Sequence, residues 1–285
     1  MTEFTFSTGA KSAAGVKVIL TSGSGINAGK FISEEEAAAL RAAVRKQKFD
    51  GKAGTFAEIF NGKTRIVAAG TGARPNALDL QILGGKLYKK ISGEETAAVF
   101  ISADKKNPLS AGETAAGIAL GIELGGYRFD KYFTKKPADS YPKLEKVEFL
   151  SETQIDDKEF AANRALANAV RYARDLCNEP ANNLTPEIYA ADIKRLDYLG
   201  IDVTVLDEAK LHDLGMDMLL SVAQGSVNSP RVAVLQWKGR KDAKEFDLGL
   251  VGKGVTFDSG GISLKPAANM GDMKGDMTGS AVVVA

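Results

Sequence analysis

The feature that most constrains the fold is a repeated alternation between short apolar segments and longer helical segments. Runs such as VKVIL and AAVFISA are short and rich in β-branched or aromatic residues, which favours strands. In the first half of the chain we expect strands at 16–20, 64–69, 97–103 and 143–150, and helices at 33–47, 76–90 and 111–124. Alternation of this kind predicts a mostly parallel sheet flanked by helices, which is an α/β fold.

The second half repeats the alternation after a boundary. A long helical pattern over 156–176 ends at CNEPANNLTPE, where Thr185 is expected to cap a new helix with Pro186 at its first position. After it we expect strands at 201–206, 231–238 and 248–257, a helix at 207–222 and a further helix from about 276. We therefore expect two α/β domains with mostly parallel sheets. The first spans 1–150, a linking helix lies in 151–180, and the second, at 181–285, is incomplete.

Composition excludes several classes of protein. The 285 residues include 37 Lys and Arg against 36 Asp and Glu, so no net field attracts nucleic acid or an anionic membrane. Apolar runs such as 281–285 are too short to span a bilayer. The N-terminal MTEFTFSTGAK has no signal-peptide pattern, and a single cysteine, Cys177, fits a reducing compartment. We expect a cytoplasmic protein.

The same counts limit the chemistry of any metal site. With one His and one Cys, a zinc site built from imidazoles and thiolates cannot form. His212 lies in an amphipathic helical segment, where a surface or half-buried position is expected rather than a catalytic one. A metal ion would therefore need oxygen ligands, with or without an amine.

Two segments resemble nucleotide-binding or nucleic-acid-binding motifs but lack their defining residues. SGSGINAGKF at 22–31 has Ser24 where a Walker A loop needs its first Gly, and Phe31 where it needs Ser or Thr. A glycine turn is expected there. The basic run KKPADSYPK at 135–143 is short and contains an aspartate, so a solvated loop explains it better than a nucleic-acid patch.

The segment GKGVTFDSGGISLK at 252–265 follows an apolar run and carries the strongest indication of chemistry. If 248–257 is a central strand, Lys253 and Asp258 lie near its carboxyl end, where α/β sheets bind ligands. A buried lysine beside a carboxylate is either half of an ion pair or a neutral amine that ligates a metal ion. Asp258 and Asp276 would supply oxygen ligands, and Gly260 and Gly261 would allow a close backbone approach.

Three blocks together resemble the leucyl (cytosol) aminopeptidases, a family of two-metal exopeptidases. The blocks are NEPANNLTP at 178–186, VAQGS at 222–226 and GKGVTFDSGGISLKPAANMGDMKGDM at 252–277. The resemblance covers the whole chain in outline. It implies a variable N-terminal α/β domain, a linking helix and the start of a catalytic domain.

The resemblance also implies roles for five residues. Lys253 would be the amine ligand of one metal ion, and Asp258 would bridge both ions. Asp276 would bind the same ion as Lys253 and lie near the free amino group of the substrate. Lys265 would polarise the scissile carbonyl, and Met273 would line the pocket for the first side chain. The cofactors implied are two divalent ions, Mn or Zn, with bicarbonate as a general base in the full-length family.

The remaining ligands of this family lie in an NTDAEGR-type block that the sequence lacks. We therefore expect a truncated chain without useful peptidase activity. Peptides are the expected substrates, and the resemblance implies a homohexamer, with no membrane role and nucleic acid disfavoured. Two alternatives stay open, namely a non-catalytic assembly protein and an N-terminal domain that binds small molecules or nucleic acid by itself.

Overall fold

The computed structural model describes residues 2–9, 11–62, 64–102, 107–240, 242 and 244–285. The chain divides into two compact units, Met1–Asn168 and Ala169–Ala285, and the division falls within helix α4 (Lys158–Asn178). Within the described residues, every helix is too short or too polar to cross a bilayer.

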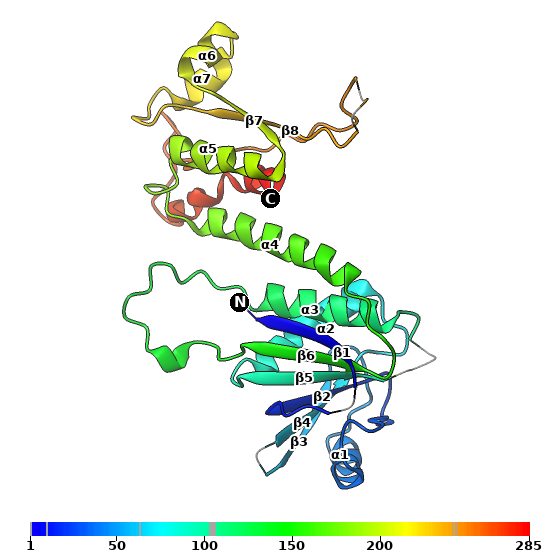
Figure 1. The fold of residues 1–285 in the computed structure, drawn as a ribbon. Coiled ribbons are helices and arrows are strands. Elements are labelled where there is room, and N and C mark those ends of the chain that lie inside the picture. The colour runs from blue at the N-terminus through cyan, green and yellow to red at the C-terminus, as the bar shows by residue number, and fades with distance from the viewer. Residues whose placement is uncertain (1, 10, 63, 103–106, 241, 243) are drawn as a thin grey trace. The chain divides into compact units, whose positions relative to one another are not determined.

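The first unit is built on a six-stranded sheet with the strand order β1-β6-β5-β2-β4-β3 (Figure 1). Its strands are β1 (Glu3–Thr8), β2 (Val16–Thr21), β3 (Phe56–Asn61), β4 (Thr64–Gly70), β5 (Thr96–Ile101) and β6 (Lys146–Ser151). Only β3 runs antiparallel to its neighbour, so the sheet is mostly parallel, as predicted. The N-terminal strand β1 pairs with the last strand of the unit, with Glu3 opposite Lys146.

Three helices cover the sheet: α1 (Glu34–Lys46), α2 (Ala77–Ile91) and α3 (Ala111–Gly125). Each begins with a capping box, in which the N-cap side chain accepts the N3 amide and the N3 carboxylate accepts the N-cap amide. The N-cap and N3 pairs are Ser33 with Glu36, Asn76 with Asp79 and Ser110 with Glu113. These local signals explain why the helix starts could be predicted closely.

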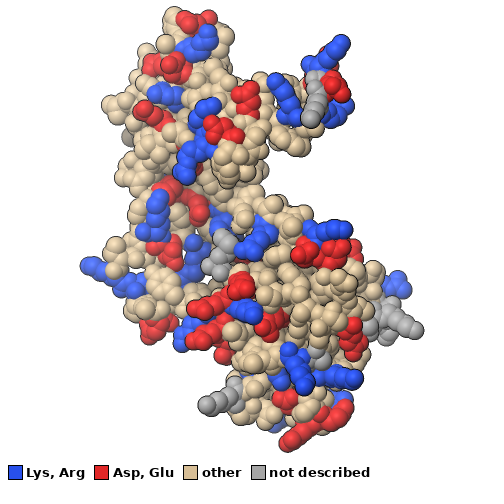
Figure 2. Space-filling model, viewed as in Figure 1, with Lys and Arg blue, Asp and Glu red and all other residues tan. Residues whose placement is uncertain are grey.

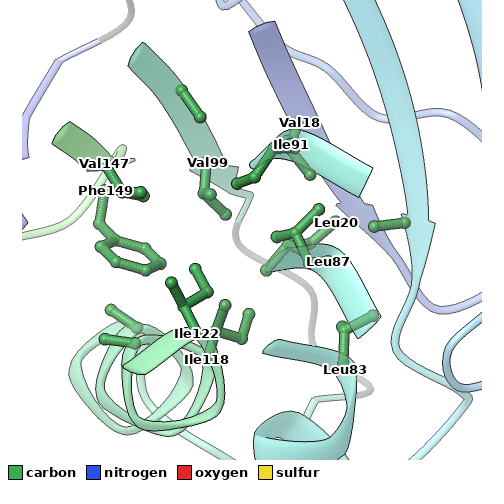
Figure 3. Packing of buried hydrophobic residues seen from close by; sticks show 14 of the residues in the cluster. Val18, Leu20, Leu83, Leu87, Ile91, Val99, Ile118, Ile122, Val147 and Phe149 are labelled. Carbon is green, nitrogen blue, oxygen red and sulfur yellow. The ribbon is translucent and has the colours of Figure 1, made fainter. Parts of the chain in front are cut away.

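The core forms one apolar layer on each face of the sheet. On one face, Leu87 of α2 and Ile118 of α3 pack with Val18 and Val99 of the central strands (Figure 3). On the other face, Leu40 of α1 packs with Ile19, Ile66 and other residues of the sheet. Successive residues of β2 thus point to opposite layers, as the period of a strand requires.

Helices α2 and α3 approach each other through glycines. A Cβ atom at Gly121 would lie 2.0 Å from the carbonyl oxygen of Gln81 and 2.8 Å from Cα of Gly84. A Cβ at Gly84 would lie 2.2 Å from the carbonyl oxygen of Ile118. Only glycine at these two positions allows the backbones to lie this close.

The second unit contains the end of α4 and short elements around an antiparallel pair of strands. These are α5 (Pro186–Lys194), η2 (Arg195–Leu199), β7 (Asp202–Leu206), α6 (Glu208–Asp213), α7 (Asp217–Ala223), β8 (Val232–Gln236), η3 (Met270–Gly275) and α8 (Thr278–Val284). Thr185 caps α5 with Pro186 in its first turn, as predicted. The expected helix at 207–222 is instead two helices, because Gly215 adopts a left-handed φ of 67° between them.

Two expectations for the second unit are wrong. Strands β7 and β8 pair antiparallel, with Val203 opposite Leu235, rather than in a parallel sheet. Residues 248–257 form no strand, and Val251 is 99% exposed. A strand needs a neighbour to take its amide and carbonyl groups, and the described β7–β8 pair does not extend to this segment. Segment 248–257 is apolar enough for a strand, but among the described residues no strand pairs with it.

Candidate metal site

The position of Lys253 is set by contact between its own backbone and the start of α8. The amide of Ser280 donates to the carbonyl oxygen of Lys253 at 2.8 Å. Glycines on both sides make this possible, since a Cβ at Gly252 would lie 2.5 Å from Cα of Ser280. A Cβ at Gly279 would lie 3.1 Å from the amide nitrogen of Lys253. Segment 252–254 is therefore held beside α8 without being part of a sheet.

Helix α8 and η3 are in turn anchored to the core of the second unit. Met277 and Ala281 are fully buried, with Leu176 and Tyr189 in the same cluster. The Tyr189 hydroxyl lies 3.1 Å from the Ser280 hydroxyl. Asp276 directly precedes Met277, so the buried Met277 side chain fixes the backbone position of Asp276.

Four charged side chains predicted for the site form two close ion pairs. Lys253 Nζ lies 2.7 Å from Asp276 Oδ2, and Lys265 Nζ lies 2.5 Å from Asp258 Oδ2. Lys253 and Asp258 also interact electrostatically, which links the two pairs. The side chain of Lys253 is 58% exposed and that of Asp276 is 22% exposed. The expectation of a buried Lys253 is therefore wrong, because no strand surrounds it.

The loop that carries Asp258 and Lys265 is closed by its own backbone. The Gly260 amide donates to Asp258 Oδ1 at 2.9 Å, and the Lys265 amide donates to the carbonyl oxygen of Ser259 at 2.9 Å. Gly260 has a φ of 100°, and a Cβ there would lie 2.4 Å from the carbonyl oxygen of Ser263. The glycine expected to allow a close approach is thus required by the turn itself.

The ion pairs shift the pKa values of two of these groups. The Asp276 carboxylate raises the pKa of Lys253 above its ordinary value, and Asp258 adds to this, while partial desolvation opposes it. The contact with Lys265 and then the Gly260 amide lower the pKa of Asp258, and Lys253 contributes further. Both shifts favour the charged forms, an ammonium at Lys253 and a carboxylate at Asp258.

The donor set fits a divalent cation. Asp276 Oδ2 is buried and lies 2.7 Å from Lys253 Nζ, so a bound cation would take the place of the ammonium group as its partner. Such an atom is normally satisfied by a hydrogen bond or an ion. No cluster of three His, Cys, Asp or Glu side chains occurs in the part of the chain that the structure describes, so an ion here would need the lysine amine as well.

Met273 was predicted to line a substrate pocket. It lies on η3 and is half-buried, and its proposed role remains a prediction. His212 lies exposed on α6, as expected. The sequence reasoning missed Gly252, Gly279 and Ser280, which hold Lys253 in place. The signal for them was the second glycine-rich stretch, GDMTGS, at 275–280.

Two family models match the chain. The N-terminal domain model of the cytosol aminopeptidase family matches residues 18–136, and its catalytic domain model matches residues 171–285. This chain belongs to the cytosol aminopeptidase family. The four charged residues of the site all lie within the part matched by the catalytic domain model of that family.

Bacterial members of the cytosol aminopeptidase family are similar along the chain. A probable cytosol aminopeptidase of Rhizobium etli is 40% identical over 290 residues, covering 99% of this chain and 58% of the relative. A probable cytosol aminopeptidase of Rhizobium rhizogenes is 47% identical over 226 residues, covering 77% of this chain and 45% of the relative. The chain thus spans about half to three-fifths of the length of these relatives.

Two solved structures have a similar fold. The bottromycin maturation enzyme BotP in complex with Mn is 30% identical, with a TM-score of 0.75, covering 95% of this chain and 55% of that one. A tomato leucine aminopeptidase mutant has a TM-score of 0.79 at 22% identity, covering 99% of this chain and 58% of that one. The second likeness supports the fold alone.

Proposed function

We propose that this chain carries part of the active site of a metal-dependent aminopeptidase, which releases N-terminal residues, with a leucine-type preference, from peptides. One observation carries the proposal. Lys253, Asp258, Lys265 and Asp276 form two linked ion pairs, and Gly252 and Gly279 hold the backbone of Lys253 against α8. Ion pairs on a protein surface form without any special backbone arrangement. Here Gly252 and Gly279 bring the backbone of Lys253 against that of α8, which supports a site rather than a chance pairing.

Lys253, Asp258 and Asp276 are the residues that would hold a divalent ion. A bound ion in such a site lowers the pKa of a ligated water and polarises a carbonyl group. For Lys253 to ligate, its amine must lose the proton that the Asp276 pairing now stabilises. A cation between these two groups would favour that loss, because it disfavours an adjacent ammonium.

Lys265 has a different task in this proposal. Its Nζ lies 2.5 Å from Asp258 Oδ2 and would face the oxygen of the scissile carbonyl, where negative charge develops. A positioned donor of this kind is worth about 3 kcal/mol of transition-state stabilisation. Asp276 would accept from the free amino group of the substrate, and Met273 would contact the first side chain through its flexible apolar chain.

The further parts of the proposal concern the complete protein. Two ions, Mn or Zn, would share Asp258, with bicarbonate as a general base held by the NTDAEGR-type block of the family, which this sequence lacks. With an amine and two carboxylates, the present chain would bind one ion weakly and have no useful turnover. A homohexamer, a cytoplasmic location and the division into 1–150, 151–180 and 181–285 belong to the same proposal.

No observation favours the alternative of a nucleic-acid-binding module. On the face that Figure 2 shows, Lys and Arg groups are interspersed with Asp and Glu groups, without an extended basic surface. Several basic residues are engaged in ion pairs, as in Arg65 with Glu58 and Lys146 with Glu148. Binding to phosphates would have to displace these carboxylates.

The test is Mn²⁺ binding by calorimetry to residues 1–285 and to three variants. Asp258→Asn and Asp276→Asn should each weaken binding by about tenfold or more, since each removes an anionic ligand. Asp272→Asn is the matched control, because it removes an exposed carboxylate of η3 near the site. Equal affinity in all four proteins would contradict the ligand assignment.

Activity is assayed in parallel with leucine p-nitroanilide and Mn²⁺, with the Rhizobium etli relative as the positive control. We expect no detectable turnover by residues 1–285. Robust Mn²⁺-dependent hydrolysis by this chain would contradict the proposal that its site is incomplete. Loss of turnover in a protein of full family length carrying Asp258→Ala would support the role of Asp258.

A further inference from the structure

A cavity of about 310 Å³ opens in the first unit, at the carboxyl ends of β2, β4 and β5. It is lined by the last residues of these strands, the loop after β2 and the first turn of α3. The lining residues are Leu20, Thr21, Ser22, Gly23, Gly25, Asn27, Thr71, Ile101, Ser102, Asn107 and Thr114. All of them belong to one compact unit, which does not contain the metal site.

The topology of the sheet explains why a cavity forms here. Strands β2 and β5 are neighbours, but the chain leaves them in opposite directions. After β2 it passes to α1 on one face, and after β5 it passes to α3 on the other face. Ligands of open α/β sheets bind in the crevice outside such a switch point. The loop 22–31, which fails as a Walker A motif, forms one wall of this crevice.

Loop 22–31 packs against another backbone segment on one side and is open on the side of two of its glycines. A Cβ at Gly51 would lie 2.4 Å from Cα of Gly23, so the loop packs directly on another backbone segment. Added Cβ atoms at Gly23 and Gly25 would meet no atom within 4 Å. These two glycines are thus not required by packing, and their open sides are consistent with a surface left bare for a ligand.

The described part of the lining offers uncharged hydrogen-bonding groups to a ligand. Its polar side chains are hydroxyls and amides, and none of the described lining residues is charged. Thr114 is fully buried and accepts from Asn107 Nδ2 at 3.1 Å, while no described residue takes its hydroxyl hydrogen. Hydroxyls and amides both donate and accept, which suits a ligand rich in hydroxyls.

The charge near the cavity and the volume of the cavity limit the class of ligand that can bind. The start of α3 already holds the Glu113 carboxylate, which accepts the Ser110 amide at 2.7 Å and disfavours an anion there. Leu20 and Ile101 add apolar surface against which a ring can pack. The volume lies near the lower end of small-molecule sites, about 300–1,000 Å³, so a nucleoside fits and a dinucleotide does not.

We propose that this cavity binds a neutral, hydroxyl-rich molecule of nucleoside size through the hydroxyl and amide groups of β2, β5 and α3. The shared chemistry is a sugar ring with adjacent hydroxyls, which a nucleoside or a free sugar can supply. The site is separate from the metal site and does not depend on peptidase activity.

The experiment measures binding of adenosine, uridine and ribose to residues 1–285 by saturation-transfer NMR, with AMP as the charged counterpart. We expect saturable binding of at least one neutral probe, and weaker binding of AMP. Binding of ribose alone or of a nucleoside alone would each support the site and would identify the source of the hydroxyls. Absence of saturable binding by every neutral probe would overturn the proposal, as would binding of AMP alone.

Two variants locate the ligand. Gly25 lines the cavity and an added Cβ there meets no atom within 4 Å, so Gly25→Leu should weaken binding by about tenfold or more, or about 1.4 kcal/mol. Gly93→Leu is the matched control, since an added Cβ there also meets nothing within 4 Å and lies outside the cavity lining. Unchanged binding in a folded Gly25→Leu protein would overturn the assignment.

Thr114→Val keeps the shape of the side chain and removes the hydroxyl, so it serves if Gly25→Leu fails to fold. It should reduce binding several-fold. Wild-type affinity in both Thr114→Val and Gly93→Leu would contradict the role of the Thr114 hydroxyl. The metal-site variant Asp276→Asn should bind the neutral probe as the wild type does, which separates this result from failure of the proposed peptidase function.

Discussion

The substitution Gly121→Ala tests how strictly the α2–α3 contact is set. The added methyl would lie 2.0 Å from the carbonyl oxygen of Gln81 and 2.8 Å from Cα of Gly84. Both are backbone atoms, so no rotamer change can relieve the contact. A carbon–oxygen contact needs roughly 3.3 Å, so the helices would have to separate by about 1 Å. That movement would loosen the layer in which Leu87 and Ile118 pack against the sheet.

The magnitude follows from two opposing effects. Overpacking of a core costs about 1–3 kcal/mol, and alanine in place of glycine in a helix returns about 1 kcal/mol. Because the clash is with fixed backbone, we expect the upper end of the first range. The expected net loss is about 2 kcal/mol. For a unit of this size, that corresponds to a decrease in Tm of about 4–8 °C.

Gly85→Ala is the matched control. It lies beside Gly84 on the same helix, but its nearest atom, the Gly121 carbonyl oxygen, would be 3.5 Å from the new Cβ. We expect unchanged or slightly higher stability, because the propensity gain meets no clash. Urea unfolding is followed by circular dichroism, and the fluorescence of the single tryptophan, Trp237, reports the second unit separately. If Gly121→Ala and Gly85→Ala unfold at the same midpoint, the reasoning is refuted.

Three further predictions concern electrostatics, capping and surface. The Ser12 hydroxyl and then Lys146 lower the pKa of Glu148 against its partial burial, so this carboxylate stabilises the fold above its ordinary pKa and loses that effect as pH falls through the lowered value. Glu148→Gln should therefore lower the free energy of unfolding by roughly 1 kcal/mol near neutral pH and make it depend less on pH in the acid range. Urea midpoints measured across the acid range test this. If the midpoints of the variant change with pH as those of the wild type do, the prediction is contradicted. Ser110→Ala removes the N-cap of α3 and should lower the free energy of unfolding by about 1 kcal/mol in urea titrations. Ser110→Thr keeps a capping hydroxyl and should retain most of the wild-type stability. Val251→Ser should reduce binding of the apolar dye ANS without changing the dichroism transition of the first unit, and unchanged dye fluorescence would count against an accessible apolar surface there.

Local signals made most elements of the first unit predictable. Helices α1, α2 and α3 begin within one residue of their predicted starts, and the four predicted strands occur within a few residues. The strands β1 and β3 were missed because both lie at the edges of the sheet, where only part of each strand is buried and the apolar pattern is weak.

The rest could not be predicted because it depends on contacts between distant segments. The apolar pattern at 248–257 fits a strand, but strand formation needs a partner that no local pattern specifies. The pairing of Lys253 with Asp276 and of Lys265 with Asp258 depends on the glycines that bring 252 beside 280. Residue types indicated the chemistry, while only the fold shows which groups meet.

Parallel pairing of β1 with β6 has a consequence for how the protein is made. Lys146 follows its partner Glu3 by 143 residues, so during synthesis β1 leaves the ribosome well before the strand with which it pairs. At about 5–20 residues per second, that delay is on the order of ten seconds, during which the first strand has no place in the sheet. Strand β1 is thus accessible to chaperones and proteases until nearly the whole unit has been translated.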